Sequence, residues 1–353
     1  MRASVLARLV LLSAALVAPG AAYAGEVGNE LAKAGDKELG TFTLQFENDL
    51  FAGTDRHYTN GMRLSWLSPE GGETIPLLQQ ARDLLALIAQ DDDQKTRFGW
   101  ALGQEIYTPT DKGTRTLITD DRPYAGWLYG ALSLHTVTKG GKESEGAKSS
   151  ESVEISLGVV GPEALGEEAQ DFVHSVRLID KFDGWDNQLD TEPGLMIAYE
   201  RRWRFADPWA LGDSLQWDFV PHAGASLGNV LTHAGLGGAV RLGLNLPDDF
   251  GPPALIHGGT PLDRLHEEGW SAYLFATAEG RFVAHNIFLD GNTWGSSHSV
   301  DREPWVGRFA LGLALEIGRF RIAYTNALVT EEFAGQSRPS RFGSISTSFQ
   351  AFF

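Results

Sequence analysis

The chain has 353 residues, a formal net charge of −17 at pH 7 and no cysteine. This negative charge argues against nucleic-acid binding, because nucleic-acid-binding surfaces are rich in Lys and Arg. A secreted chain of this length without disulfides is typical of a bacterial envelope protein that depends on extensive sheet pairing for its stability.

The first 24 residues have the organisation of a secretory signal peptide. Arg2 and Arg8 form a basic start, residues 9–17 are a short apolar core, and residues 22–24 provide a small-x-small cleavage site. We therefore expect one mature domain over residues 25–353. No run of about 18 apolar residues follows, so the sequence predicts no helical membrane span.

The mature chain alternates apolar and polar residues over stretches of about ten positions. In one stretch, Val153, Ile155 and Leu157 alternate with Glu154 and Ser156. Charged residues on the polar face suit a lumen. The pattern therefore predicts an all-β fold, a twelve-stranded antiparallel transmembrane β-barrel. We expect strands near residues 40–50, 57–67, 97–107, 124–137, 152–161, 192–204, 214–226, 236–246, 269–283, 304–317, 319–329 and 340–353.

An even number of strands places both chain ends on the periplasmic side. The connections near residues 50–57, 108–123 and 162–191 are then extracellular. Residues 74–94 have the Leu/Ile spacing of an amphipathic helix, which we expect on the periplasmic side. The last strand ends in Phe353, and a terminal aromatic residue resembles the signal by which the barrel-assembly machinery recognises outer-membrane barrels.

Residues 42–64 read as two strands joined by a loop that is rich in polar side chains, including Asn48, Asp49 and Thr59. Such a loop has more ionisable and hydrogen-bonding side chains than an ordinary hairpin turn needs. Strand alternation predicts that Asp49 and Thr59 lie on the polar face of the barrel, near the outer rim.

Residues 163–180, in the third outer connection, predict a helix. Gln170 and His174 are spaced i, i+4 and therefore share one face of it. We expect Phe172, Val173 and Val176 to pack the helix against the barrel rim.

A histidine beside carboxylates indicates hydrolysis. Imidazole can take a proton from water at neutral pH, and carboxylate and carbonyl oxygens can hold Ca²⁺, which polarises an ester carbonyl. The sequence contains neither a G-x-S-x-G elbow nor an H-E-x-x-H helix. A metal-assisted histidine mechanism is therefore favoured over a serine triad or a zinc site.

Five segments together resemble the LpxR family of outer-membrane lipid A 3'-O-deacylases. Their order and spacing match the family over the first two-thirds of the mature chain, whereas the last third resembles it mainly as barrel strands. The segments are 47–61 (ENDLFAGTDRHYTNG), 104–109 (QEIYTP), 120–127 (DDRPYAGW), 159–174 (VVGPEALGEEAQDFVH) and 184–189 (GWDNQL).

The resemblance implies a site between the barrel wall and a helix from an outer loop. It also implies Ca²⁺ and a water activated by histidine. The implied catalytic residues are His174, Gln170, Asn48 and Thr59, and the implied metal ligand is Asp49.

Two further positions depart from the family. Asp180 stands where the family has a glutamate six residues after the histidine, so its role as a second metal ligand rests on a shorter side chain. The family's substrate-binding lysine has an approximate counterpart in Lys112, and Arg115 competes for that role.

The sequence thus favours a Ca²⁺-dependent esterase that removes the 3'-acyloxyacyl chain of lipid A in the outer leaflet of the bacterial outer membrane. The expected partners are lipopolysaccharide and outer-membrane lipids. Two alternatives remain at this point: an outer-membrane phospholipase with similar chemistry, and a structural or pore-forming barrel without activity.

Overall fold

The computed structural model describes residues 40–52, 57–69, 94–111, 113–139, 148–177, 182–252, 255 and 269–351. Its strands are β1 (Gly40–Asn48), β2 (His57–Leu67), β3 (Gln94–Thr108), β4 (Ala125–Lys139), β5 (Lys148–Val160), β6 (Glu192–Arg204), β7 (Trp209–Leu211), β8 (Leu215–Gly228), β9 (Leu231–Leu244), β10 (Trp270–Asn286), β11 (Trp305–Ile317), β12 (Phe320–Val329) and β13 (Ser340–Ala351). Its helical segments are η3 (Asp49–Ala52), η4 (Pro162–Ala164), α4 (Gly166–Arg177), η5 (Trp185–Asn187) and α5 (Ile287–Asp290).

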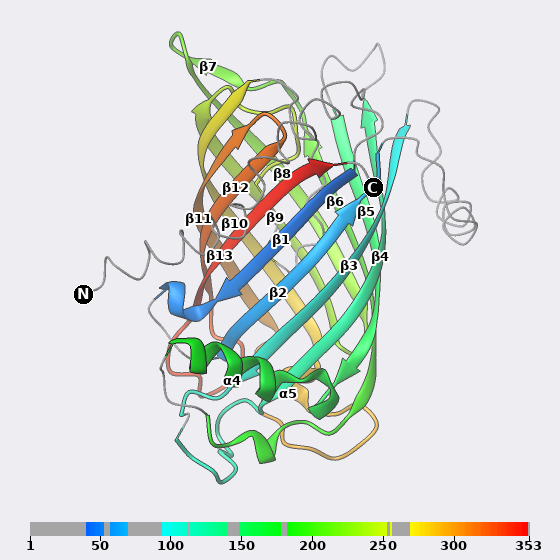
Figure 1. Ribbon diagram of the computed structural model, residues 1–353, viewed down its shortest axis with the longest axis vertical. Coiled ribbons are helices and arrows are strands. Elements are labelled where there is room, and N and C mark those ends of the chain that lie inside the picture. The colour runs from blue at the N-terminus through cyan, green and yellow to red at the C-terminus, as the bar shows by residue number, and fades with distance from the viewer. Residues whose placement is uncertain are drawn as a thin grey trace, which may run out of the picture.

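The strands form a closed antiparallel barrel (Figure 1). β1 pairs with β13, and β6 pairs with β8, so the ring closes at both seams. β7 has only three residues and pairs with β8 alone, outside the ring. The remaining twelve strands confirm the predicted twelve-stranded fold, and their bounds follow the predicted ones closely.

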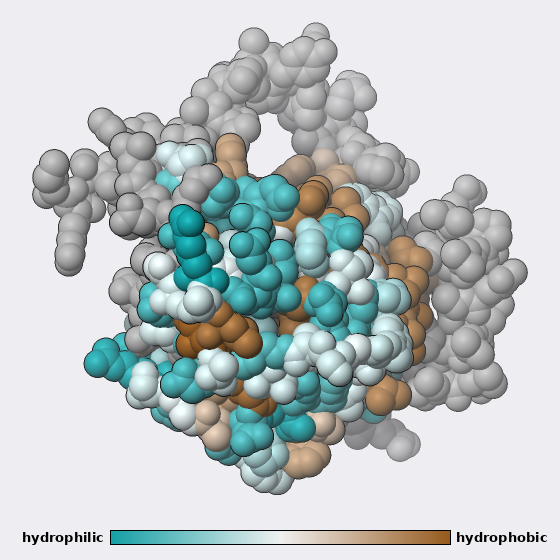
Figure 2. All heavy atoms as spheres, turned by 90° about the horizontal axis from the view of Figure 1, so that it is seen from below, coloured by the Kyte–Doolittle hydropathy of each residue, from teal (hydrophilic) through white to brown (hydrophobic). Residues whose placement is uncertain are grey.

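The first and last strands place both ends of the barrel sequence at one end, because Gly40 is paired with Ala351. The helices α4 and α5 lie at the opposite end (Figure 1). Seen from that end, the surface is mostly polar, with small apolar patches (Figure 2). We refer to this as the outer end, because the termini of outer-membrane barrels lie on the periplasmic side.

The two faces of the wall differ as the alternation predicts. On β1, Gln45 and Glu47 are buried in the lumen, whereas Leu44 is 46% exposed on the outer face. The lumen is filled by buried ion pairs between strands: Arg63 Nη2 lies 2.6 Å from Glu154 Oε2. These pairs satisfy charges that would otherwise be costly to bury.

A segment after β9 also enters the lumen. Its Asp249 carboxylate is bound by Arg241 of β9 and by Arg321 of β12. Each arginine also pairs with a second carboxylate, Asp218 and Glu316 respectively. Asp249 therefore ties the periplasmic connection to two strands at once.

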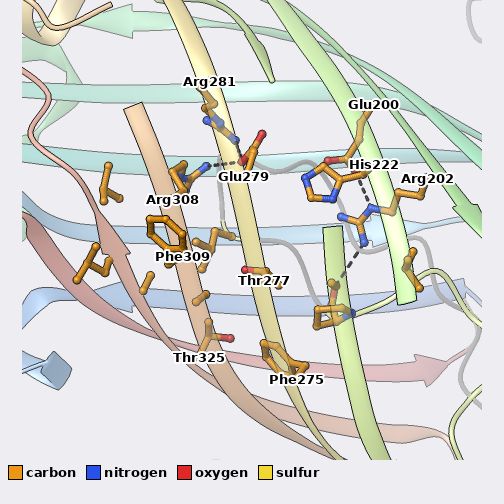
Figure 3. Close-up of a pocket in the computed structure, with 18 of the residues that line it drawn as sticks. Glu200, Arg202, His222, Phe275, Thr277, Glu279, Arg281, Arg308, Phe309 and Thr325 are labelled. Atoms are coloured by element: carbon orange, nitrogen blue, oxygen red, sulfur yellow. Dashed lines mark hydrogen bonds and ion pairs between the residues drawn. The ribbon is translucent and has the colours of Figure 1, made fainter. Parts of the chain in front are cut away.

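Between these pairs the lumen holds a cavity of about 80 Å³. Figure 3 shows Arg281 and Arg308 directed at Glu279, at 3.0 and 3.9 Å. On another side of the cavity, Arg202 bonds to Glu200 at 2.6 Å. These pairs lie within one strand or between neighbouring strands, so they line the wall of the cavity with charge.

Several predictions concern residues outside the described ranges, among them the signal peptide over residues 1–24, the terminal Phe353 and the periplasmic helix over 74–94, of which only Gln94 is described, as the first residue of β3. Of the helices that the structure describes, none is long and apolar enough to cross a membrane.

Replacing Asp249 by Ala tests the account of the lumen. We expect Asp249→Ala to lower the free energy of unfolding by about 3–5 kcal/mol, because it leaves buried arginines without their shared carboxylate. Thermal unfolding in detergent measures the loss.

Asp183→Ala is the control. Asp183 and Arg115 form an ion pair at 3.7 Å in which both side chains are exposed, at 45% and 81%, and exposed pairs contribute about 0–1 kcal/mol. Equal stability of Asp249→Ala and the wild type would contradict the role given to Asp249.

Candidate active site

Polar side chains lie on the outward-facing side of the barrel wall at its outer end. Asn48 ends β1 on the same face as the exposed Leu44, and Asn60 stands opposite it on β2. Both are nevertheless buried, with exposed fractions of 2% and 7%. Other parts of the chain must therefore cover these two residues. Elsewhere, the outer face of the wall is uncovered and carries apolar residues.

Thr59 joins this outer face through a β-bulge. The β2–β3 register is Tyr58 to Tyr107 and then Asn60 to Ile106, which leaves Thr59 as the extra residue. Tyr58 donates to Glu47 in the lumen. Thr59 Oγ1 instead lies 2.6 Å from the hydroxyl of Thr108, a residue on the outward face of β3.

The prediction that Thr59 faces the lumen is therefore wrong. Simple alternation assigns Thr59 to the lumen side, but a bulge shifts the alternation by one residue and re-aims the side chain.

Part of the cover is α4, which lies across the outer ends of β2 and β3 (Figure 1) and contacts β3 and β4. Gln104 of β3 donates its side-chain amide to the carbonyl oxygens of Ala164 and Leu165, at 2.7 and 3.1 Å. Gly126 of β4 permits the close approach, because a Cβ there would lie 3.0 Å from the Ala164 Cβ and 3.3 Å from the Gly166 nitrogen.

An aromatic cluster fills the space around α4. It consists of Ile106, Tyr124, Phe182 and Trp185, all buried, with Ala169 of α4 against it. Burial raises the pKa of the Tyr124 hydroxyl, so this group stays neutral at physiological pH. The cluster fixes α4 to the wall and keeps water out of the contact.

Gln170 and His174 of α4 are each only 2% exposed. The His174 ring lies 5.5 Å from the Phe182 ring, measured between centroids. Trp185 Nε1 donates to Gln170 Oε1 at 2.8 Å. An indole N–H only donates, so the carbonyl oxygen of Gln170 must face Trp185. Its Nε2 amide is buried and has no hydrogen-bond partner among the described residues.

The prediction for the apolar residues of this helix is partly wrong. Phe172 does not pack against the rim but is 69% exposed, because it lies on the side of α4 away from Gln170 and His174. The side chain of Val176 is outside the described part of the structure.

Asp49 follows Asn48 directly and begins η3, which packs against β13 and β2. Its side chain is completely buried. Opposite Asn48, the amide oxygen of Asn60 is buried and has no hydrogen-bond partner in the described ranges. Oxygen atoms of carboxylate and amide groups are the ligands that Ca²⁺ prefers, so this donor set fits the predicted ion.

The metal ligands are not complete in the described ranges. These ranges contain no cluster of three or more His, Asp or Glu residues able to hold a metal. The predicted second ligand, Asp180, lies outside them. Amide, hydroxyl and backbone oxygens beside Asp49 would therefore have to supply much of the coordination.

Of the two predicted substrate-binding residues, the structure describes one. Arg115 lies in the outer connection between β3 and β4, with its side chain 81% exposed and 3.7 Å from Asp183. Its carbonyl oxygen accepts from Asn187 at 2.8 Å, which links this connection to the segment after α4. Lys112 lies outside the described residues.

A family model described as outer membrane protein LpxR matches residues 9–351. The chain belongs to the LpxR family. It is an outer-membrane protein with the family's barrel fold.

Comparison with solved structures agrees on the fold. LpxR from Salmonella typhimurium is 20% identical, with a TM-score of 0.68 over 89% of this chain and 100% of that one. The β domain of the Bordetella autotransporter BrkA is 9% identical, with a TM-score of 0.45 over 89% of this chain and 98% of that one. A comparison with curated proteins finds no match.

The structure adds residues that sequence reasoning missed as parts of this LpxR-family site. Asn60 and Thr108 share the covered face, Gln104 and Gly126 seat the helix, and Trp185 orients Gln170. All five lie in segments that resemble the family. Their roles depend on the bulge and on the docking of α4, which no local pattern reveals.

A side chain at position 126 should displace α4 without opening the barrel. We expect Gly126→Val to make residues 161–177 sensitive to protease on intact cells, because the added atoms overlap Ala164 and Gly166. The barrel itself should keep its heat-modifiable migration in gels.

Gly130→Val is the control. It lies on the same strand and the same outer face, but its nearest contact would be Leu102 at 3.8 Å. If both variants resist protease equally, α4 is not seated through Gly126.

Proposed function

We propose that this protein is a Ca²⁺-dependent esterase that hydrolyses the 3'-acyloxyacyl chain of lipid A. Membership of the LpxR family supports a lipid A deacylase in the outer membrane. The observation that carries the proposal is the burial of His174 and Gln170 on the side of α4 that faces the barrel wall, where the outward face of the wall bears buried polar side chains. A lipid would reach a site there from the side, within the membrane plane.

His174 acts as the general base. It takes a proton from a water molecule as that water attacks the ester carbonyl carbon, and it later gives the proton to the leaving alkoxide of the sugar. The contact with Phe182 fixes one side of the ring. Because water is the nucleophile, no acyl-enzyme forms.

Gln170 positions the reacting oxygen atoms. Trp185 holds its carbonyl oxygen, so the buried Nε2–H group is left to donate to the attacking water or to the ester oxygen that becomes negatively charged. A fixed donor of this kind is effective because it needs no reorganisation during the reaction. Asn48 and Thr59 shape the same region from the wall side.

Asp49 is the first candidate to hold the ion, with Asp180, the Asn60 amide oxygen and backbone oxygens as further ligands. Bound there, Ca²⁺ would polarise the ester carbonyl and offset the charge that develops on its oxygen. Asp49 is completely buried beside Asn48, and carboxylate oxygens are among the ligands that Ca²⁺ prefers.

We propose Arg115 as a contact for the lipid headgroup. Its guanidinium is largely exposed at the outer end, and guanidinium groups bind phosphate oxygens in pairs. We assign Arg115 and Lys112 to the phosphates or sugars of lipid A.

Replacing His174 tests the reaction. We expect His174→Ala to lower the deacylation rate by about 10²–10⁴-fold, the usual contribution of a general base. Mass spectrometry of lipid A from a host expressing the protein should show loss of the 3'-linked chains with wild type and not with the variant.

His298→Ala is the control, because His298 is also in the outer loops but binds a backbone carbonyl oxygen, that of Asp121. Unchanged lipid A in a host with folded wild-type protein would overturn the proposal. Release of fatty acid from glycerophospholipid instead would identify a phospholipase.

The ion is tested through Asp49. We expect chelation by EGTA to abolish activity and Asp49→Asn to raise the Ca²⁺ concentration for half-maximal activity at least about tenfold, since one ligand charge is lost. Glu163→Gln changes an exposed carboxylate in η4, just before α4, and should leave the Ca²⁺ response unchanged. Full activity of Asp49→Asn in micromolar Ca²⁺ would rule out this ligand.

A further inference from the structure

The helix α4 is divided into three sides by its sequence. Gly166, Gln170 and His174 face the wall. With 3.6 residues per turn, one flank carries Glu167, Glu168, Asp171 and Ser175, and the other carries Ala169, Phe172 and Val173. A helix with one polar and one apolar flank is suited to lie in the plane of a membrane interface.

The apolar flank is exposed at Phe172, whereas Ala169 packs against the aromatic cluster. Phe172 is 69% exposed, and Leu165, at the start of the helix, is 49% exposed. Leu165 also adopts a left-handed conformation with φ of 56°, which glycine adopts more easily than leucine. An exposed leucine at such a position indicates that its side chain contacts something outside the protein.

The exposed flank continues the lipid-facing surface of the barrel. Leu165 is bound through its carbonyl oxygen to Gln104, and Gln104 is followed down the outer face of β3 by Leu102, which is 59% exposed. On β4, Gly126 beneath the helix is followed by Leu128, which is 37% exposed. Exposed apolar side chains of the wall therefore lie directly below the start of the helix.

We propose that Leu165 and Phe172 form an acyl-chain contact surface that holds the fatty-acyl chains of lipid A beside the catalytic site. This inference rests on the proposed function for the identity of the lipid. The chains lie along the outer wall and the apolar flank of α4, while the acidic flank faces water. The contact brings the ester, at the head of the chain, to the depth of His174 and Gln170 on the neighbouring side of the same helix.

The position of the flank can be measured without turnover. The chain has no cysteine, so Phe172→Cys carries a single fluorescent label, and Glu167→Cys places the same label on the acidic flank, on the other side of the helix from Phe172. In vesicles of phosphatidylcholine and lipid A, we expect doxyl groups on the acyl chains to quench the label at position 172 and aqueous iodide to quench the label at position 167. Iodide quenching of both labels would overturn the acyl-chain contact.

Kinetics then test the link to lipid A. We expect Phe172→Ser to raise KM for lipid A about tenfold with little change in kcat, because an apolar contact of a phenyl ring is lost. Phe172→Leu should restore most of the affinity, and Glu168→Ser should behave as wild type. A wild-type KM for Phe172→Ser overturns the proposal. If the wild type does not hydrolyse lipid A but the acyl chains still quench the label on Phe172→Cys, the proposed function and the identity of the lipid are overturned instead.

Discussion

The site depends on the requirement that polar groups on the outer face of a membrane barrel be covered. Asn48, Thr59 and Asn60 stand on that face, where hydrocarbon would leave their hydrogen-bonding atoms unsatisfied at a large free-energy cost. Two elements cover this rim: η3 packs against β13 and β2, and α4 lies across the outer ends of β2 and β3 and packs against β3 and β4. The packing of α4 also brings Gln170 and His174 to the wall, so one contact helps to cover the rim and assembles the site.

The barrel keeps two polar systems apart. The lumen contains ion pairs such as Arg63 with Glu154, which cross-link strands and are buried from both solvent and lipid. The catalytic candidates lie on the other side of the wall. This separation explains how a protein can be rigid in its interior and still offer a site to a lipid. A lipid reaches the outer face by lateral diffusion, without leaving the membrane to enter the lumen.

The sequence predicted most of the fold, because alternation over ten residues repeats along the chain and defines each strand. It also placed Gln170 and His174 correctly on one face of a loop helix. It failed at Thr59, because a bulge depends on the pairing of two strands and leaves no local mark in the alternation. It failed at Phe172. A helix of a water-soluble protein would bury this apolar side chain, whereas a helix at a membrane surface can expose it. The ion pairs of Asp249 with Arg241 and Arg321 in the lumen could not be predicted either, because no local sequence pattern indicates which strands a connection will contact.

The central claim is that the barrel wall and α4 act as one catalytic unit. A double-mutant cycle with Thr59→Val on the wall and Gln170→Ala on the helix tests it through the rate of lipid A deacylation. The effects of substitutions at residues that act as a unit are strongly non-additive. The double variant should therefore be only slightly less active than the less active of the two single variants. Losses that multiply would show that the two residues act independently and would contradict a single site beneath α4.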